Sequence, residues 1–189
     1  MSKFAPYEPR PANLPTPKVP PAMGGLAIAP AAPRDIDAVA RLTFEREGGS
    51  YDHVRERAER WLAASASADG SNLFLVARVD RFVAGYGRAG LVRGRNDHEY
   101  DVPEGWYLGG LVVDQAWRRR GIGRALTRHR LDQIIGRGVT EAYYFVNSIN
   151  RASIDLHAAF GFVEIRRDFR FPGVNFSAGG TGVLFRATF

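Results

Sequence analysis

The sequence predicts an α/β (α+β) fold built on a mixed sheet of about six or seven strands. From Leu26 onward, stretches with the two-residue period of a strand alternate with stretches of helical period. The run WYLGGLVV, residues 106–113, is nearly continuously apolar, which is typical of a strand covered on both faces. A chain of 189 residues, 45% of them hydrophobic, can bury one substantial core but is short for two. Residues 26–189 are therefore expected to form a single domain.

The expected elements follow one another along this domain. Strand patterns cover residues 26–30, 72–79, 82–92, 106–113, 141–146, 162–171 and 182–189. Helical patterns cover residues 33–47, 51–64, a segment starting near 121, and 149–160. Asp80 and Arg81 separate two strands and predict a hairpin, and Gly161 is placed where a left-handed helix cap is expected.

Two segments lack a periodic pattern. Residues 1–25 hold seven of the eleven prolines and few apolar side chains. They cannot bury enough surface to offset their ordering entropy, so an extended, disordered tail is expected there. Residues 93–105 form a polar connector, and a connector of this length in a compact domain is usually functional or disordered.

The composition excludes several kinds of chemistry. The sequence has no cysteine, which rules out disulfides, thiolate metal sites and a cysteine nucleophile. No pair of histidines has the spacing of metal ligands, so no metal is expected. No apolar run approaches the roughly 18 residues of a membrane span, and the N-terminus lacks the apolar core of a secretory signal. These features predict a soluble, cytoplasmic protein without a membrane partner.

The positive charge of the chain is concentrated in one segment. The formal net charge is +6, and the segment 118–130 contains no acid and six arginines: Arg118, Arg119, Arg120, Arg124, Arg128 and Arg130. A nucleic-acid binder usually spreads its charge along a stripe interleaved with aromatic residues. A compact cluster fits a small polyphosphate better, although an arginine bias of the genome is an alternative source of the cluster.

The cluster surrounds the stretch WRRRGIGRAL, residues 117–126, in which a buried strand leads through glycines into a helix. The first N–H groups of a helix lack partners and carry partial positive charge, so this turn predicts an anion site. A Walker loop requires Lys-Ser/Thr where the chain has Arg124 and Ala125, and a dinucleotide fingerprint requires glycine where it has Leu126. Both are excluded, which leaves a different phosphate loop or a solvated turn.

Arg118, Gly121 and Gly123 resemble the Arg/Gln-x-x-Gly-x-Gly/Ala motif of the Gcn5-related N-acetyltransferases (GNAT). The segment NSINRASIDLHAAFGF resembles the fourth helix of the same superfamily, with six residues in register: Asn150, Ala152, Ser153, Leu156, Gly161 and Phe162. The resemblance covers residues 26–189 and is strongest over 106–162. It implies a mostly antiparallel sheet with about four helices and acetyl-CoA as the co-substrate, without a metal.

The resemblance also implies how acetyl-CoA is held. Backbone amides of the loop would bind its pyrophosphate, through Arg118, Arg119, Arg120, Gly121, Ile122, Gly123 and Arg124. The strand residues Leu111, Val112 and Val113 would hydrogen-bond the pantetheine arm, as a partner strand does. Asn150 and Ser153 would contact the cofactor from the helix. Gly109 and Gly110 could form a bulge that opens room for the acyl group, and the N–H near Leu111 could polarise the thioester carbonyl.

Two residues are predicted to carry proton transfer. Many members of the family have a tyrosine that protonates the leaving thiolate where this chain has His157, and an imidazolium can also donate a proton. The alternative is a histidine that only packs or caps the helix. The amine must lose a proton before it attacks, and Glu104 is the first choice for the base because it is the acid of the 93–105 connector closest to the strand. A solvated loop charge is the alternative for Glu104.

These observations predict a cytoplasmic N-acetyltransferase that transfers the acetyl group of acetyl-CoA directly to an amine acceptor. The absence of cysteine agrees with direct transfer. The sequence does not identify the acceptor, because acceptor loops carry no transferable code. Two alternatives remain open, a non-catalytic acyl-CoA-binding regulatory domain and a nucleic-acid-binding module. The expected partner is the amine acceptor and not nucleic acid, and a homodimer is left open.

Overall fold

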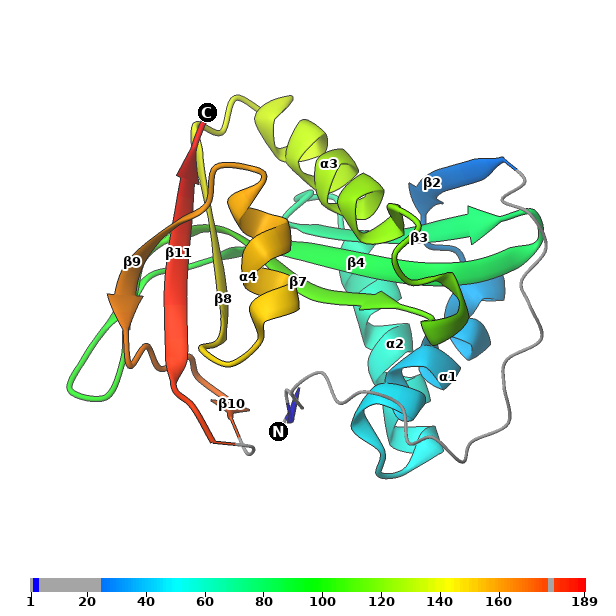
Figure 1. Ribbon diagram of the computed structural model, residues 1–189, viewed down its shortest axis with the longest axis horizontal. Helices are drawn as coiled ribbons and strands as arrows, with labels where there is room; N and C mark the ends of the chain where they lie inside the picture. Colours follow the sequence, from blue (N-terminus) through cyan, green and yellow to red (C-terminus); the bar gives the residue numbers. More distant parts are fainter. Residues whose placement is uncertain (1, 4–24, 177–178) are drawn as a thin grey trace.

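The computed structural model describes residues 2–3, 25–176 and 179–189 (Figure 1). Its main sheet has seven strands in the order β2-β3-β4-β7-β8-β11-β9. These strands are β2 (Leu26–Pro30), β3 (Asn72–Val79), β4 (Phe82–Val92), β7 (Gly105–Val113), β8 (Glu141–Asn147), β9 (Val163–Arg167) and β11 (Gly182–Thr188). The α-helices are α1 (Ile36–Glu47), α2 (Tyr51–Ser65), α3 (Ile122–Ile135) and α4 (Arg151–Ala158). The predicted mixed, mostly antiparallel sheet with four helices is confirmed.

The helices lie on opposite faces of the sheet. Side chains of α1 and α2 pack with Phe74, Val76 and Tyr86. The next residues along β3, Leu75 and Ala77, point the other way and pack against the start of α3. Because successive strand residues face opposite sides, this alternation places α1 and α2 on one face and α3 on the other. The near-continuous apolar run of β3 reflects burial on both faces.

The middle of the sheet is split. β7 and β8 are parallel and pair only at Trp106, Tyr107 and Leu108, whereas the other neighbours in the sheet are antiparallel. Figure 1 shows β3, β4 and β7 running across the molecule, β8, β11 and β9 running nearly at right angles to them in the view, and α4 in front of the place where the two halves part. Among the described residues, no strand therefore pairs with the C-terminal half of β7 on its β8 side.

Several local features differ from the sequence-based expectations. The 93–105 connector contains a short hairpin, β5 (Arg95–Asn96) and β6 (Asp101–Val102), which explains how it can be ordered without an apolar pattern. The last predicted helix is shorter than expected, and the strand expected over 162–171 ends at Arg167, because Asp168 has a positive φ of 54°. The helix predicted over 33–47 begins as a 3-10 turn, η1 (Pro33–Asp35), and the 3-10 helix η2 (Gln115–Trp117) was not predicted.

The predicted N-terminal tail lies almost entirely outside the described residues. Within it, β1 (Ser2–Lys3) pairs in parallel with β10 (Val174–Asn175). Disorder of residues 1–25 and the single domain over 26–189 stay predictions. In the part of the chain that the structure describes, no helix is long and apolar enough to cross a membrane.

Candidate active site

A cavity of about 1000 Å³ lies where β7 and β8 part. Its walls come from the second half of β7, the following loop with the first turn of α3, the middle of β8 and the inner side of α4. Leu42, Glu45 and Arg46 of α1 line its other end. The cavity thus joins the face that carries α3 and α4 to the face that carries α1 and α2, across the edge of β7.

The β7 edge is distorted at the glycine pair. Along β4, Tyr86 pairs with Val112 and Arg88 pairs with Gly109, so a single residue of β4 faces Gly110 and Leu111. Gly110 has a φ of 55°, a backbone conformation that is unfavourable for any residue with a Cβ atom. The predicted bulge is confirmed at Gly110. It turns the backbone of β7 away from β8 and leaves the edge from Gly109 to Val113 along the cavity.

Arg130 fixes the bulge from the α3 side. Its Nη1 donates to the carbonyls of Arg88 at 2.8 Å and Gly109 at 3.2 Å, one from each of the two strands. Its Nη2 donates to Thr127 Oγ1 at 3.0 Å. The side chain is fully buried, and burial lowers the pKa of Arg130 to about 9. The sequence placed Arg130 in the arginine cluster expected to bind a polyphosphate. In the structure its guanidinium instead binds backbone carbonyls of β4 and β7.

The loop before α3 has the geometry of an anion site. Arg119 and Gly121 both have left-handed backbone, with φ of 61° and 82°, and α3 begins at Ile122. Left-handed residues directly before a helix start are an arrangement in which successive backbone N–H groups can bind one anion. A Cβ atom on Gly121 would have no neighbour within 4 Å, so glycine is favoured there by backbone conformation and open access rather than by packing.

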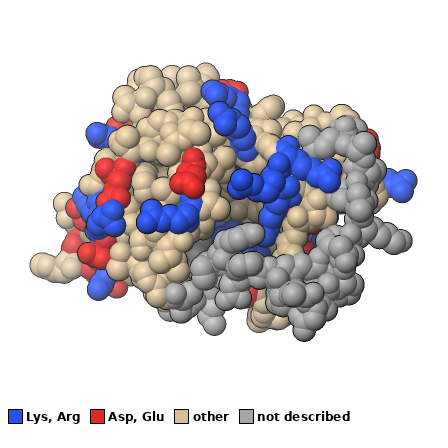
Figure 2. All heavy atoms as spheres, viewed as in Figure 1, with Lys and Arg blue, Asp and Glu red and all other residues tan. Residues whose placement is uncertain are grey.

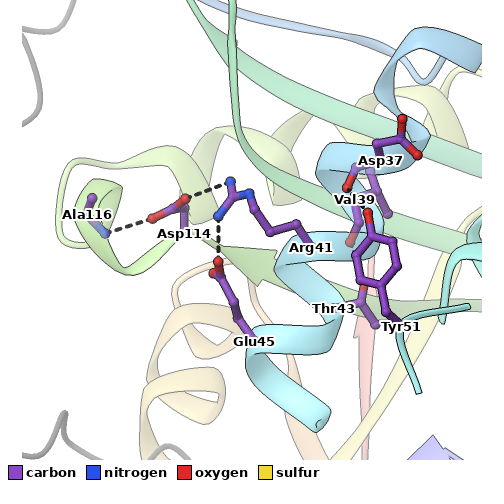
Figure 3. Close-up of polar contacts among 8 residues, drawn as sticks. All are labelled: Asp37, Val39, Arg41, Thr43, Glu45, Tyr51, Asp114 and Ala116. Carbon is purple, nitrogen blue, oxygen red and sulfur yellow. Dashed lines mark hydrogen bonds and ion pairs between the residues drawn. The ribbon is translucent and has the colours of Figure 1, made fainter. Parts of the chain in front are cut away.

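Side chains on both sides of the loop hold it in place. Asp114 Oδ1 accepts from the N–H of Ala116 at 2.9 Å and begins η2. Figure 3 shows Arg41 of α1 between two carboxylates, 2.8 Å from Glu45 and 3.1 Å from Asp114. Beyond η2, Arg118 Nε donates to the carbonyl of Val113 at 3.1 Å. The loop is thereby tied both to α1 and to the end of β7.

The arginine cluster divides into groups with different roles. Arg118, Arg119 and Arg124 line the cavity. Arg120 stacks on Trp117 instead, with its guanidinium carbon 5.3 Å from the ring centre, and Arg128 lies over another aromatic ring outside the cavity. Figure 2 shows basic side chains gathered around the middle of the viewed face, whereas most of the acidic ones lie over its left half. The cavity mouth is therefore positively charged without using the whole cluster.

Most of the residues predicted to bind the cofactor meet at this cavity. Those that line it are Leu111, Val112, Val113, Arg118, Arg119, Gly121, Ile122, Gly123, Arg124, Asn150 and Ser153. Arg120 is not among them. Asn150 has a structural role as well, because its Oδ1 accepts from the N–H of Ser153 at 3.2 Å and caps α4. The two motifs, about thirty residues apart in sequence, thus face each other across one space.

His157 lines the cavity from α4 but is almost completely buried. Its ring stacks on Tyr144 with 3.9 Å between centroids, and its Nδ1 lies 2.8 Å from the carbonyl oxygen of Ser153. Burial, reinforced by the nearby charge of Arg130, lowers the pKa of His157 to about 3. At neutral pH the imidazole is therefore neutral, and a carbonyl acceptor so close to Nδ1 requires the ring proton to be on that nitrogen. This arrangement does not favour the expected imidazolium acid, and the acid role stays a prediction.

Tyr144 is a site residue that sequence reasoning assigned only to strand packing. It lines the cavity at the point where β8 leaves β7, and its hydroxyl is buried without a hydrogen bond to any described group. Burial raises the pKa of Tyr144 far above its ordinary value, and the Ser153 side chain acts more weakly in the opposite direction. The phenol therefore stays protonated. Its position beside His157 could not be inferred from a strand pattern alone.

Glu104 does not lie at the cavity. It is exposed and precedes the first residue of β7, whereas the cavity is lined by the far half of that strand. At about 3.3 Å per residue, the strand separates Glu104 from Leu111 by roughly 20 Å. The choice of Glu104 as the base is therefore not supported, because the strand carries the reacting end away from the connector. The carboxylates that line the cavity are those of Glu45, Asp114 and Asp155.

The cavity suits an elongated ligand with an anionic end. One end offers loop amides and arginines, and the middle offers an edge of β7 that β8 does not pair. The family described as "Acetyltransferase (GNAT) family" matches residues 36–162, a range that includes every residue that lines the cavity. The chain belongs to the GNAT acetyltransferase family. Members of this family use acetyl-CoA, and the predicted membership is confirmed.

Two curated relatives illustrate the similarity. Mycothiol acetyltransferase of Nocardioides sp. is 35% identical over 139 residues, which cover 68% of this chain and 44% of that protein. The ribosomal protein bS18-alanine N-acetyltransferase of Escherichia coli is 39% identical over 61 residues, or 31% of this chain and 41% of that enzyme. The matched parts thus span less than half the length of either relative, so neither name carries an acceptor to this GNAT chain.

Solved structures agree on the fold. The PaiA N-acetyltransferase of Thermoplasma acidophilum, crystallised in complex with coenzyme A, superposes with a TM-score of 0.62 at 15% identity. The superposition covers 87% of this chain and 99% of that one. At this identity the similarity concerns the fold alone.

Proposed function

We propose that this GNAT protein transfers the acetyl group of acetyl-CoA directly to an amine, without a covalent enzyme intermediate. The observation that carries the proposal is the joining of an anion loop and an unpaired strand edge along one cavity. A nucleic-acid-binding module would need the basic side chains as an exposed stripe. Here one arginine of the cluster is buried as a backbone clamp and others stack on aromatic rings.

In this proposal the two ends of acetyl-CoA are recognised differently. The amides of residues 119–124 hold the pyrophosphate at the start of α3, and Arg118, Arg119 and Arg124 add positive charge. The β7 edge at Leu111, Val112 and Val113 binds the pantetheine arm through backbone hydrogen bonds, in the manner of an added strand. Asn150 and Ser153 contact the arm from α4. The acetyl group then lies at the bulge.

The reaction forms one bond and breaks one. The nitrogen of the neutral amine attacks the thioester carbonyl carbon, the new N–C bond forms, and the C–S bond breaks as the thiolate of coenzyme A leaves. An N–H of β7 near Leu111 would donate to the carbonyl oxygen while negative charge develops there. The acceptor ammonium gives up one proton to a base, and the second proton lost from nitrogen ends on the sulfur. The net products are an amide, coenzyme A and one proton.

Glu45 is our choice for the base, acting through a water molecule. It lines the cavity on α1, at the end reached by an acceptor, and Arg41 holds its carboxylate at 2.8 Å. Asp114 is engaged in capping η2, and Asp155 lies on α4 at the cofactor side. The candidates for the acid that protonates the leaving thiolate are the neutral His157 and the protonated Tyr144, whose rings stack on each other. A thiol with a pKa near 8.5 leaves readily as a thiolate, so a strong acid is not required.

Two measurements test the proposal. Acetyl-CoA should raise the melting temperature of the protein at ordinary salt, and short oligonucleotides should not. Thiol release from acetyl-CoA with a broad amine library, read by mass, should then identify acetylated products. Stabilisation by acetyl-CoA without any product would leave the non-catalytic acyl-CoA-binding domain. Stabilisation by oligonucleotides alone would contradict the proposal. Cytoplasmic location is a further expectation, and the oligomeric state is left open.

A further inference from the structure

Three arginines gather on the side of the bulge that faces α1 and α2. Arg88 of β4 has its guanidinium carbon 3.7 Å from the ring centre of Trp61, and Arg57 of α2 lies 5.2 Å from the same ring. Arg46 of α1 donates through Nη1 to the carbonyl of Leu111 at 3.2 Å. The fold therefore assembles three positive charges around one aromatic ring and the distorted end of β7.

Two of these guanidinium groups have an N–H donor that makes no hydrogen bond to the described chain. The Nε atoms of Arg57 and Arg88 are buried and have no hydrogen-bond partner in the described chain. Arg57 is paired with Glu47, whereas Arg88 has no ion pair with a described carboxylate. Burial lowers the pKa of Arg88 to about 10, which still leaves it charged at neutral pH. A buried guanidinium is costly unless an anion accepts from it, and contact with Trp61 offsets only a part of this cost.

Arg88 and Arg57 do not line the cavity themselves, and Arg88 lies directly behind one of the residues that do. A Cβ atom on Gly110 would lie 2.7 Å from Arg88 Nε, so this guanidinium packs directly on the bulge. Gly110 lines the cavity, and so do Glu45 and Arg46. In the proposed function, an N–H near the next residue, Leu111, donates to the carbonyl oxygen of the thioester. A group bound by Arg88 would therefore be only a few bonds from an amine that attacks this carbonyl.

We propose that Arg88, with Arg57 and Arg46 beside it, binds a carboxylate of the acceptor, and that the acceptor is an α-amino acid or a similarly compact amino carboxylate. This inference rests on the proposed acetyl transfer and names its substrate class. The planar guanidinium suits a carboxylate, to which it can donate two parallel hydrogen bonds. Glu45 lies at the same end of the cavity and would face the amine. The two charges of a zwitterionic acceptor would thus be matched by opposite charges.

The test compares free α-amino acids with their carboxamides, which keep the amine and lose the negative charge. Thiol release from acetyl-CoA gives kcat/KM for each member of a pair. We expect the wild-type protein to prefer the best amino acid over its carboxamide by at least about tenfold, as the loss of a charge-assisted pair predicts. Arg88→Gln and Arg57→Gln should reduce this ratio toward one, mainly through KM. Arg60→Gln, one turn along α2 and exposed, is the matched control and should keep it.

The outcomes separate this inference from the proposed function. Absence of a melting shift with acetyl-CoA would contradict the proposed function itself. A melting shift combined with equal use of acids and carboxamides, or with no acid acetylated, would overturn only the carboxylate site. A folded Arg88→Gln variant that keeps the wild-type ratio would overturn it as well. If Arg88→Gln does not fold, as judged by circular dichroism, Arg57→Gln decides, because its side chain lies nearer the surface.

Discussion

The two sides of the β7 bulge present positive charge in different ways. On the side of α3 and α4, the proposed anion site consists of backbone amides at a helix start, with the side chains of Arg118, Arg119 and Arg124 along the cavity. On the side of α1 and α2, the guanidinium groups of Arg57 and Arg88 lie against Trp61, and Arg46 donates to the carbonyl of Leu111. A site built from one continuous loop suits a cofactor that all members of a family share. A site built from scattered side chains can change with the acceptor.

This difference explains what the sequence could predict. The loop at residues 117–126 is contiguous, so its residue order already determines its geometry, and the strand, turn and helix were all predicted. The positions of Arg46, Arg57 and Arg88 depend on how α1, α2 and β4 pack, which no local pattern expresses. Glu104 was chosen because it is near β7 in sequence, but the reacting end is at the other end of that strand.

Some missed residues did leave a signal. Ile122, Leu126 and Arg130 are spaced by four and are all buried, so Arg130 continues the apolar stripe of α3. A charged residue on such a stripe is expected to bond to backbone or to a partner, which distinguishes it from the other arginines of the cluster. Tyr144 gave no comparable signal, because its neighbours in β8 are aromatic on both faces of the sheet.

The largest expected effect concerns the bulge that both sides share. Arg130→Met should lower the free energy of unfolding by about 3 kcal/mol, because the carbonyls of Arg88 and Gly109 lose their donor while they remain buried. Arg128→Met, an exposed change on the same helix, should cost less than about 0.5 kcal/mol. Urea unfolding measures both. Equal stability of the two variants would contradict the clamp.

The next largest effect concerns the buried imidazole of His157, on the cofactor side of the bulge, and the pH dependence of stability that it causes. The pKa of His157 is about 3 in the folded protein and about 6.5 in an unfolded chain, so between these values only the unfolded state takes up the proton. Stability should therefore fall as the pH decreases below 6.5, by about 2 kcal/mol at pH 5 from this group. His157→Phe should remove this part of the acid sensitivity.

The comparison uses the difference between pH 7 and pH 5 for each variant, so that any loss of packing cancels. His129→Phe, on the exposed side of α3, is the control and should behave as the wild-type protein does. An unchanged pH dependence in His157→Phe would mean that His157 is protonated in the folded state. The imidazolium acid inferred from the sequence would then regain support.

A smaller effect isolates the anion loop. Gly121 and Gly138 both have left-handed backbone, with φ of 82° and 76°, and neither has an atom within 4 Å of an added Cβ. Alanine at either position should cost about 1 kcal/mol of stability. Only Gly121→Ala should weaken acetyl-CoA binding, by about tenfold or 1.4 kcal/mol, because only its Cβ would stand in the path of the phosphates. Calorimetric titration measures the affinities, and equal affinities would remove the loop from the site.

The smallest effect probes the link between the two sides. Arg41→Gln removes the contact of α1 with Asp114, an ion pair that is partly exposed, and should lower stability by less than about 1 kcal/mol. Because Asp114 also caps η2 before the loop, acetyl-CoA affinity should fall about threefold. Arg55→Gln, which removes an exposed ion pair between α2 and α1, should leave the affinity unchanged. Equal affinities in the two variants would show that the loop does not need this support.

Amide hydrogen exchange with and without coenzyme A tests the central claim most directly, because it reports each backbone segment separately. Coenzyme A should slow exchange at residues 111–113 of β7 and at residues 119–124 of the loop, and leave the residues around Arg57 and Arg88 unchanged. Protection confined to the α1 and α2 side, or saturable binding that leaves the β7 edge and the loop unprotected, would contradict the account.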